Sequence, residues 1–174
     1  MNWYQAADDP EIVEFGPVRG LAVSGRGEPG GAEHGTAVRA LYAVAGAAGL
    51  PPAPLEGRWW VEDDRPPLEV PRDEWRWHLF LRVPDDVAEV DAGRAGPGAA
   101  ARVQLVTFTE GRCVQMLHRG PFEDEPRSLA RMDAFIRAEG LVHHGLHHEI
   151  YLTDFRETDP DAQLTILRQP VRAA

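Results

Sequence analysis

Alternating apolar and polar residues are the main structural signal along the chain. Side chains of a β-strand point alternately to the two faces of a sheet, so this alternation predicts half-buried strands. It predicts strands at residues 14–24, 55–63, 73–83 and 164–167, and a further strand that starts at His147. Two more β-rich runs, residues 102–109 and 112–118, are expected to pair through a hairpin-like connection at Glu110-Gly111.

Apolar residues at helical spacing predict two helices. In residues 37–49 the spacing is carried by Val38, Leu41 and Ala45, and Gly49 ends the pattern. A stripe of Leu129, Met132, Phe135 and Ile136 predicts a second helix over residues 122–140. Residues 85–101 are interrupted by Gly and Pro, which favours a short helix or a plain linker.

The order of these elements is strand, helix, strand, strand, given twice. Such a repeat predicts two βαββ halves, each with a helix packed on one side of an antiparallel sheet. We therefore expect an α+β fold in a single domain over residues 1–174. Its first half would cover about residues 14–83, a connector about 84–101, and its second half about 102–172.

Composition narrows the functional classes. The formal charge of −10 argues against a general nucleic-acid binder or an anionic membrane surface as partner. The single cysteine, Cys113, lies in an apolar run, which favours a buried thiol over a nucleophile. The chain has neither a signal-peptide pattern at its start nor an apolar run of the roughly 20 residues that span a bilayer. We expect a cytoplasmic protein, and a homo-oligomer is compatible with the sequence.

The segment from His147 to Phe155 combines strand character with an acid. Glu149, Tyr151 and Thr153 share one face of the predicted strand. A carboxylate beside an aromatic ring suits a flat, cationic ligand, whereas the alternative is a solvated residue on an open sheet face. If the two halves are aligned through Asp63 and Asp154, Trp60 falls opposite Tyr151.

Four histidines near this strand raise the question of a metal site. The pairs His143/His147 and His144/His148 have the spacing of helical ligands. Gly145 and the strand that follows argue against a helix there, so we expect neither a native metal nor a cofactor.

Several segments together resemble the GyrI-like small-molecule-binding proteins. These segments are LEGRWWVED, EWRWH, LHRGPFEDEP, HHEIYLTDFR and the closing TILRQPV. The resemblance covers nearly the whole chain from about Phe15. It implies a duplicated βαββ fold with a ligand cleft between the halves. The family includes effector domains of BmrR-type multidrug regulators, stand-alone binders of flat cationic dyes, and cyclopropanoid cyclopropyl hydrolases.

The resemblance also implies roles for individual residues. Glu149 matches the acidic strand residue of the family, Tyr151 its neighbouring aromatic residue, and Trp59 and Trp60 its tryptophan strand. We expect Trp60 to line the cleft and Trp59 to pack under the helices. No helix-turn-helix segment precedes the domain, which favours a stand-alone binder or enzyme over a regulator.

Four further residues are candidate ligand contacts, with core packing as the alternative for each. Trp77 lies near a strand end, Met116 and His118 share a strand face, and Phe122 follows the Gly120-Pro121 turn.

Three functions are compatible with this pattern. The first is the binding of flat, aromatic, often cationic molecules, with Glu149 as counter-charge. The second is hydrolysis of electrophilic cyclopropanes, with Glu149 activating water. The third is inhibition of a partner protein through a surface contact, for which the acidic charges are dispersed rather than in one run.

Overall fold

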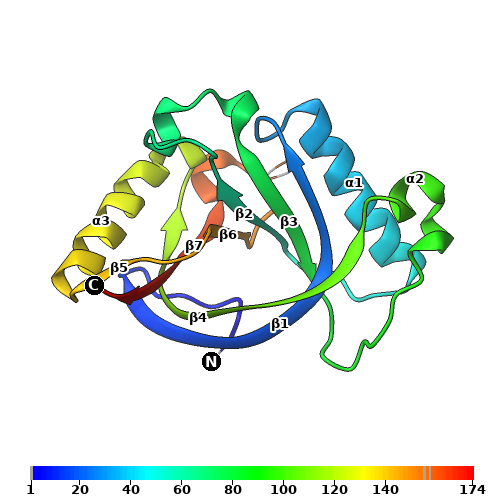
Figure 1. Cartoon of the computed structure of the whole chain (residues 1–174), viewed down its shortest axis with the longest axis horizontal. Coiled ribbons are helices and arrows are strands. Elements are labelled where there is room, and N and C mark those ends of the chain that lie inside the picture. The colour runs from blue at the N-terminus through cyan, green and yellow to red at the C-terminus, as the bar shows by residue number, and fades with distance from the viewer. Residues whose placement is uncertain (1, 155, 157) are drawn as a thin grey trace. The chain divides into compact units, whose positions relative to one another are not determined.

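The structure is a computed structural model that describes residues 2–154, 156 and 158–174. Its strands are β1 (Glu11–Arg26), β2 (Leu55–Trp60), β3 (Arg76–Arg82), β4 (Gln104–Arg119), β5 (Leu141–His143), β6 (His147–Tyr151) and β7 (Leu164–Ala173). Its helices are α1 (Ala32–Ala47), α2 (Pro97–Ala100) and α3 (Glu125–Ala138), as labelled in Figure 1. The fold is α+β, as the sequence predicts. None of the described helices is long and apolar enough to cross a membrane.

The chain divides into two compact units. Unit 1 comprises Met1–Pro17 together with Thr109–Ala174, and unit 2 is Val18–Phe108. Strands β1 and β4 each contribute residues to both units. The predicted duplication of two βαββ halves stays a prediction.

Unit 2 is built on β3, which pairs antiparallel with β1 on one side and with β2 on the other. The register places Leu21 beside Leu81 and Trp59 beside Trp77. Helix α1 buries one stripe of small and branched residues, namely Ala37, Val38, Ala40, Leu41 and Val44. This stripe follows the helical period, which is why α1 could be predicted from the sequence.

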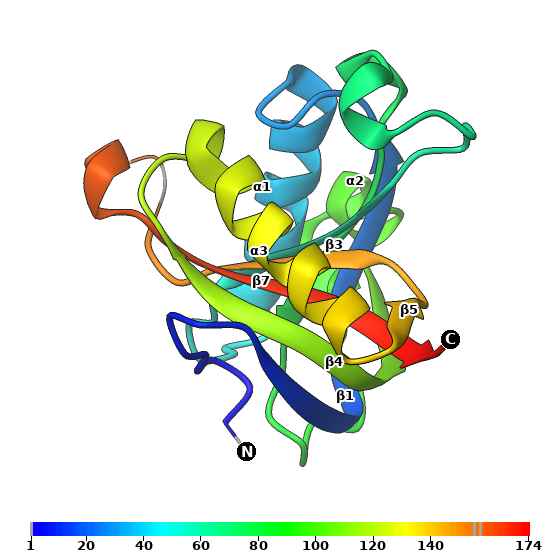
Figure 2. The same cartoon turned by 90° about the vertical axis from the view of Figure 1, so that its left-hand side faces the viewer.

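Unit 1 is built on β7, which pairs antiparallel with β4, β5 and β6. Helix α3 lies across this sheet in front of β4 and β7 (Figure 2). The core of the unit contains Met132 and Ile136 of α3, packed with Met116 and Leu167 of the sheet. Helix α3 therefore covers the face of the unit 1 sheet on which Met116 and Leu167 lie.

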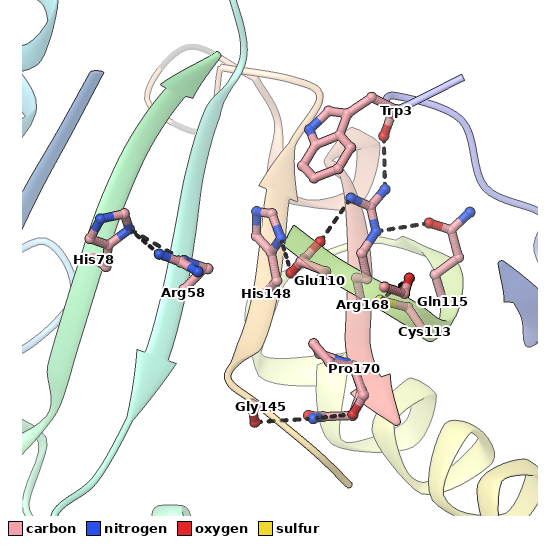
Figure 3. Close-up of polar contacts among 12 residues, drawn as sticks. Trp3, Arg58, His78, Glu110, Cys113, Gln115, Gly145, His148, Arg168 and Pro170 are labelled. Carbon is pink, nitrogen blue, oxygen red and sulfur yellow. Dashed lines mark hydrogen bonds and ion pairs between the residues drawn. The ribbon is translucent and has the colours of Figure 1, made fainter. Parts of the chain in front are cut away.

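The opposite face of the unit 1 sheet carries a buried charge network (Figure 3). Glu110 accepts from His148 Nδ1 at 2.8 Å and from Arg168 Nη1 at 3.4 Å. Arg168 also donates to Gln115 Oε1 and to the Trp3 carbonyl, at 3.0 and 2.8 Å. Although burial alone would raise it, the charges and hydrogen bonds of His148 and Arg168 hold the pKa of Glu110 below its ordinary value.

The same surroundings make Cys113 unreactive. It is fully buried, and its burial, together with the charge of Glu110, raises the pKa of the thiol to about 12. Only the thiolate is nucleophilic, so a protonated buried thiol is a packing group. This agrees with the expectation from the apolar run around Cys113.

The predicted hairpin at Glu110-Gly111 is wrong. The chain does not reverse there, because β4 runs without a break from Gln104 to Arg119. Gly111 has a positive φ of 67°, a local irregularity that a continuous strand accommodates. Glu110 is held inside by partners on β6 and β7, which local sequence cannot reveal.

Two smaller elements also differ from expectation. The short strand β5 follows α3 where no strand was predicted, and β7 extends six residues beyond the predicted end at Leu167, to Ala173. Residues 85–101, expected as a short helix or a linker, contain the four-residue helix α2 and a 3₁₀ turn at Ala92–Ala95.

Candidate functional site

Strand register places the candidate acid on the face that α3 covers. The register aligns Glu149 with Leu167 and Met116 in one row, and Tyr151 with Thr165 and His118 in the next. Residues that pair across neighbouring strands point to the same side of the sheet. Since Met116 and Leu167 pack against α3, Glu149 and Tyr151 also point to the α3 side.

The Glu149 carboxylate is held by both of its oxygens. The Tyr151 hydroxyl donates to Oε2 at 2.7 Å, and Oε1 lies 3.2 Å from His147 Nε2. These three residues occupy alternate positions of β6, which confirms that Glu149 and Tyr151 share a face. The Glu149 side chain keeps 16% of its surface exposed, so the acid is shielded but still accessible.

Phe122 extends this group. Its ring meets the Tyr151 ring edge-on, with centroids 5.8 Å apart, and Phe122 is itself 39% exposed. It is the first residue of the 3₁₀ turn Phe122–Asp124 that leads into α3. The sequence-predicted residues Glu149, Tyr151 and Phe122 are thus brought together within unit 1, while Phe155 of the same motif lies outside the described residues.

His118 and Met116 face α3 but are engaged in packing. Met116 is buried in the core beneath the helix. His118 is buried too, with Nε2 3.0 Å from the Pro121 carbonyl and Nδ1 2.9 Å from Ser128 Oγ. A carbonyl can only accept, so Nε2 carries the proton, and in the neutral ring Nδ1 accepts from Ser128. Both nitrogens are occupied in fixing the start of α3, and a ligand role for either residue stays a prediction.

Glu125 joins the candidate site although the sequence did not single it out. It is the first residue of α3 and only 8% exposed. Its Oε1 is buried without a hydrogen-bond partner in the part of the chain that the structure describes. Burial, and then the nearby charge of Glu149, raise the pKa of Glu125 to about 9. The site therefore holds two acids, of which Glu125 is neutral at pH 7.

No sequence signal distinguishes Glu125. An acid in the first turn of a helix is an ordinary feature, because it complements the helix dipole. What makes Glu125 unusual is its burial beside Glu149, and that follows from tertiary packing.

The three candidate tryptophans belong to unit 2. Trp59 stacks on His34 of α1, with ring centroids 5.8 Å apart, so its ring packs against that helix. Trp77 is fully buried, and its Nε1 donates to the Gly27 carbonyl at 3.2 Å. Trp60 is half-buried. Ligand contacts by these residues stay predictions.

The histidines around β6 contact different partners. His143 contacts Asp133 at 2.9 Å, His147 contacts Glu149, and His148 contacts Glu110. Among the described residues, no group of three His, Cys, Asp or Glu side chains is placed to hold a metal ion.

A separate surface hollow lies in unit 2. It has a volume of about 160 Å³ and is lined by Arg26, Glu62, Asp63, Val70, Glu74 and Arg76. Its walls are mainly polar, and it includes none of the predicted site residues. The candidate site is therefore the group of residues around Glu149.

Comparison with known proteins finds structures of the same fold. An uncharacterized conserved protein from Listeria innocua is 37% identical, with a TM-score of 0.87, over 98% of this chain and 95% of the other. A hydrolase from Listeria innocua is 36% identical, with a TM-score of 0.82 and the same coverage. SAV2435, solved bound to tetraphenylphosphonium, shares the fold at 11% identity, with a TM-score of 0.53 over 94% of each chain. No curated protein gives a significant match.

A family sequence model also matches this chain. The profile of the GyrI-like small molecule binding domain matches residues 8–168. This range includes the network of Glu110 and Arg168 and the whole candidate site around Glu149. The chain belongs to the GyrI-like small-molecule-binding family.

Proposed function

We propose that this protein binds flat, aromatic, often cationic small molecules through Glu149 and the rings beside it. The observation that carries the proposal is a shielded but accessible carboxylate, fixed by Tyr151 and His147, next to two aromatic side chains. A carboxylate attracts a delocalised cation. Each aromatic face adds roughly 0.5–2 kcal/mol of cation–π attraction.

Two observations support a cationic ligand. The net charge of −10 produces a negative field that raises the local concentration of cations, in a salt-dependent manner. SAV2435, a protein of the same fold, was solved with tetraphenylphosphonium, which is an aromatic cation.

A second candidate function is hydrolysis, and the relative described as a hydrolase favours it. In this alternative Glu149 takes a proton from a water molecule as the water oxygen attacks a ring carbon of an electrophilic cyclopropane. The C–O bond forms, the ring C–C bond breaks, its electron pair passes to the electron-withdrawing group that activates the ring, and the proton returns to that group. Binding and hydrolysis need the same residue types, so one variant separates them. Glu149→Gln should lose turnover of a neutral cyclopropane substrate while still binding it.

The binding proposal is tested by titrating rhodamine 6G, a flat cationic dye, into wild type and Glu149→Gln. Dye polarisation and tryptophan fluorescence report binding. Glu139→Gln, at the exposed C-terminal end of α3, removes the same charge away from the site and serves as the control. We expect saturable binding that weakens at least about tenfold in Glu149→Gln only, since the variant removes a shielded counter-charge. Absence of binding by wild type would refute the proposal.

A further inference from the structure

Glu125 has a carboxyl oxygen that makes no hydrogen bond within the described residues. Oε1 is buried, and no group within the described residues donates to it or accepts from it. A buried polar atom without a partner costs free energy, so native structures rarely keep one without a use.

The surroundings of Glu125 favour a neutral acid over an anion. Glu149 on β6 is the negative group that acts on it, and His147 and Tyr151 of the same strand are already committed to Glu149. On β4, His118 bonds Ser128 and Pro121 instead.

Charged groups on the helix itself do not compensate Glu125. Asp124 pairs with Arg127 at 3.5 Å, on side chains that are 44% and 83% exposed. Arg131 pairs with Asp9, and Asp133 with His143. Within the described part of the chain, these ion pairs of α3 therefore supply no positive charge to Glu125.

We propose that Glu125 is the second acid of the Glu149 site, and that it releases its proton when a cationic ligand binds. This inference rests on the proposed function. The exchange is balanced: the neutral acid and a cation become a carboxylate–cation pair, and the proton passes to the buffer. The incoming positive charge offsets the repulsion from Glu149, so Glu125 ionises in the complex.

The exchange sets the specificity of the site. A neutral aromatic ligand leaves the proton on Glu125, whose O–H remains a hydrogen-bond donor. A cation must displace that proton, so its affinity rises with pH. Linkage sets the upper limit of this rise at about tenfold per pH unit. The affinity of a neutral ligand should not change over the same range.

Calorimetry of rhodamine 6G binding tests the inference directly. Titrations are run at one pH near 8 in phosphate and in Tris, which take up protons with different enthalpies. The difference between the two binding heats is proportional to the number of protons that the complex releases. This pH is above the ordinary titration range of histidine, near 6.5. The variants are Glu125→Gln, a neutral isostere of the protonated acid, and Glu139→Gln as control.

We expect wild type and Glu139→Gln to release up to one proton per dye, and Glu125→Gln to release none. The carboxyl ¹³C chemical shift of Glu125 in wild type gives a second readout, which should move to its ionised value on dye binding. Dye binding without proton release, or equal release by Glu125→Gln, overturns this inference and leaves the proposed function standing. Absence of dye binding by wild type overturns both.

Discussion

The Tyr151 hydroxyl donates to the Glu149 carboxylate at 2.7 Å, a shorter contact than the 3.2 Å between Glu149 and His147. The 2.7 Å bond joins a hydroxyl donor to a charged acceptor, a class that is shorter and stronger than neutral hydrogen bonds. Both residues lie on the same face of a five-residue strand, so the bond holds them in one orientation. The site is therefore preorganised before any ligand arrives.

Tyr151→Phe tests this preorganisation. The variant keeps the ring that meets Phe122 but removes the hydroxyl that donates to Glu149 Oε2. We expect a loss of roughly 1.5–3 kcal/mol in the free energy of unfolding, the usual range for a hydrogen bond to a charged group. Urea denaturation measures it, and an unchanged midpoint would show that water replaces the hydroxyl without cost.

Glu125 makes a prediction about stability and pH. Its raised pKa means that the folded state holds a proton which the unfolded chain gives up above the ordinary carboxyl value. The folded protein is therefore progressively destabilised as pH rises from about 4.5 to about 9. Glu125→Gln cannot ionise and avoids this loss.

We expect Glu125→Gln to be more stable than wild type at pH 7, on the order of 1–3 kcal/mol. The difference should vanish below about pH 4, where the acid is protonated in both states. Thermal unfolding across this range measures it. A difference that does not depend on pH would contradict a neutral Glu125.

Among the elements, β4 shows where local sequence stops being informative. The pair Glu110-Gly111 has the composition of a two-residue turn, and Gly111 does adopt a positive φ. Glu110 decides that the chain continues as one strand instead of turning. Its partners His148 and Arg168 lie 38 and 58 residues away in the sequence. A periodic stripe such as that of α3 is local and was predictable, whereas a buried ion pair is not.

The candidate site divides in the same way. Alternation along β6 places Glu149 and Tyr151 on one face, and this was predictable because it depends on neighbouring residues alone. The approach of Glu125 depends on how α3 packs on the sheet. His118 also shows this limit: its spacing suggests a ligand contact, while its nitrogens bind Ser128 and Pro121.

Glu110→Gln tests whether the buried network holds β4, β6 and β7 together. The side chains of His148 and Arg168 are fully buried, so removing the negative charge leaves their partner groups uncompensated. We expect a loss of about 3–5 kcal/mol at pH 7, the range for breaking a buried ion pair. Urea denaturation at neutral pH checks this value.

The sign of the pH dependence follows from the lowered pKa of Glu110. Its contribution is present above the ordinary carboxyl pKa and is lost as the pH falls through the lower value of the folded state. Wild type and Glu110→Gln should therefore converge in strongly acidic solution. Equal stability at pH 7 would contradict a stabilising network.

At the scale of the whole molecule, unit 1 is assembled from both ends of the sequence. Met1–Pro17 belongs to the same unit as Thr109–Ala174. Trp3 is 5% exposed, its ring lies 4.4 Å from the Arg168 guanidinium, and it meets Phe15 edge-on at 4.9 Å. The first residues thus close the buried network, and the unit cannot be complete until they are in place.

Trp3→Ala tests this assembly. The variant keeps the backbone carbonyl that accepts from Arg168, so it removes only the ring that shields the guanidinium. We expect a loss of about 3–5 kcal/mol, the usual cost of truncating a buried tryptophan. Leu68→Ala, at a position that is 68% exposed, is the control and should change the free energy of unfolding by less than about 0.5 kcal/mol. If both variants unfold at the wild-type urea concentration, the first residues do not contribute to unit 1. A selective loss in Trp3→Ala would mean that folding of the candidate site around Glu149 depends on the opposite end of the chain.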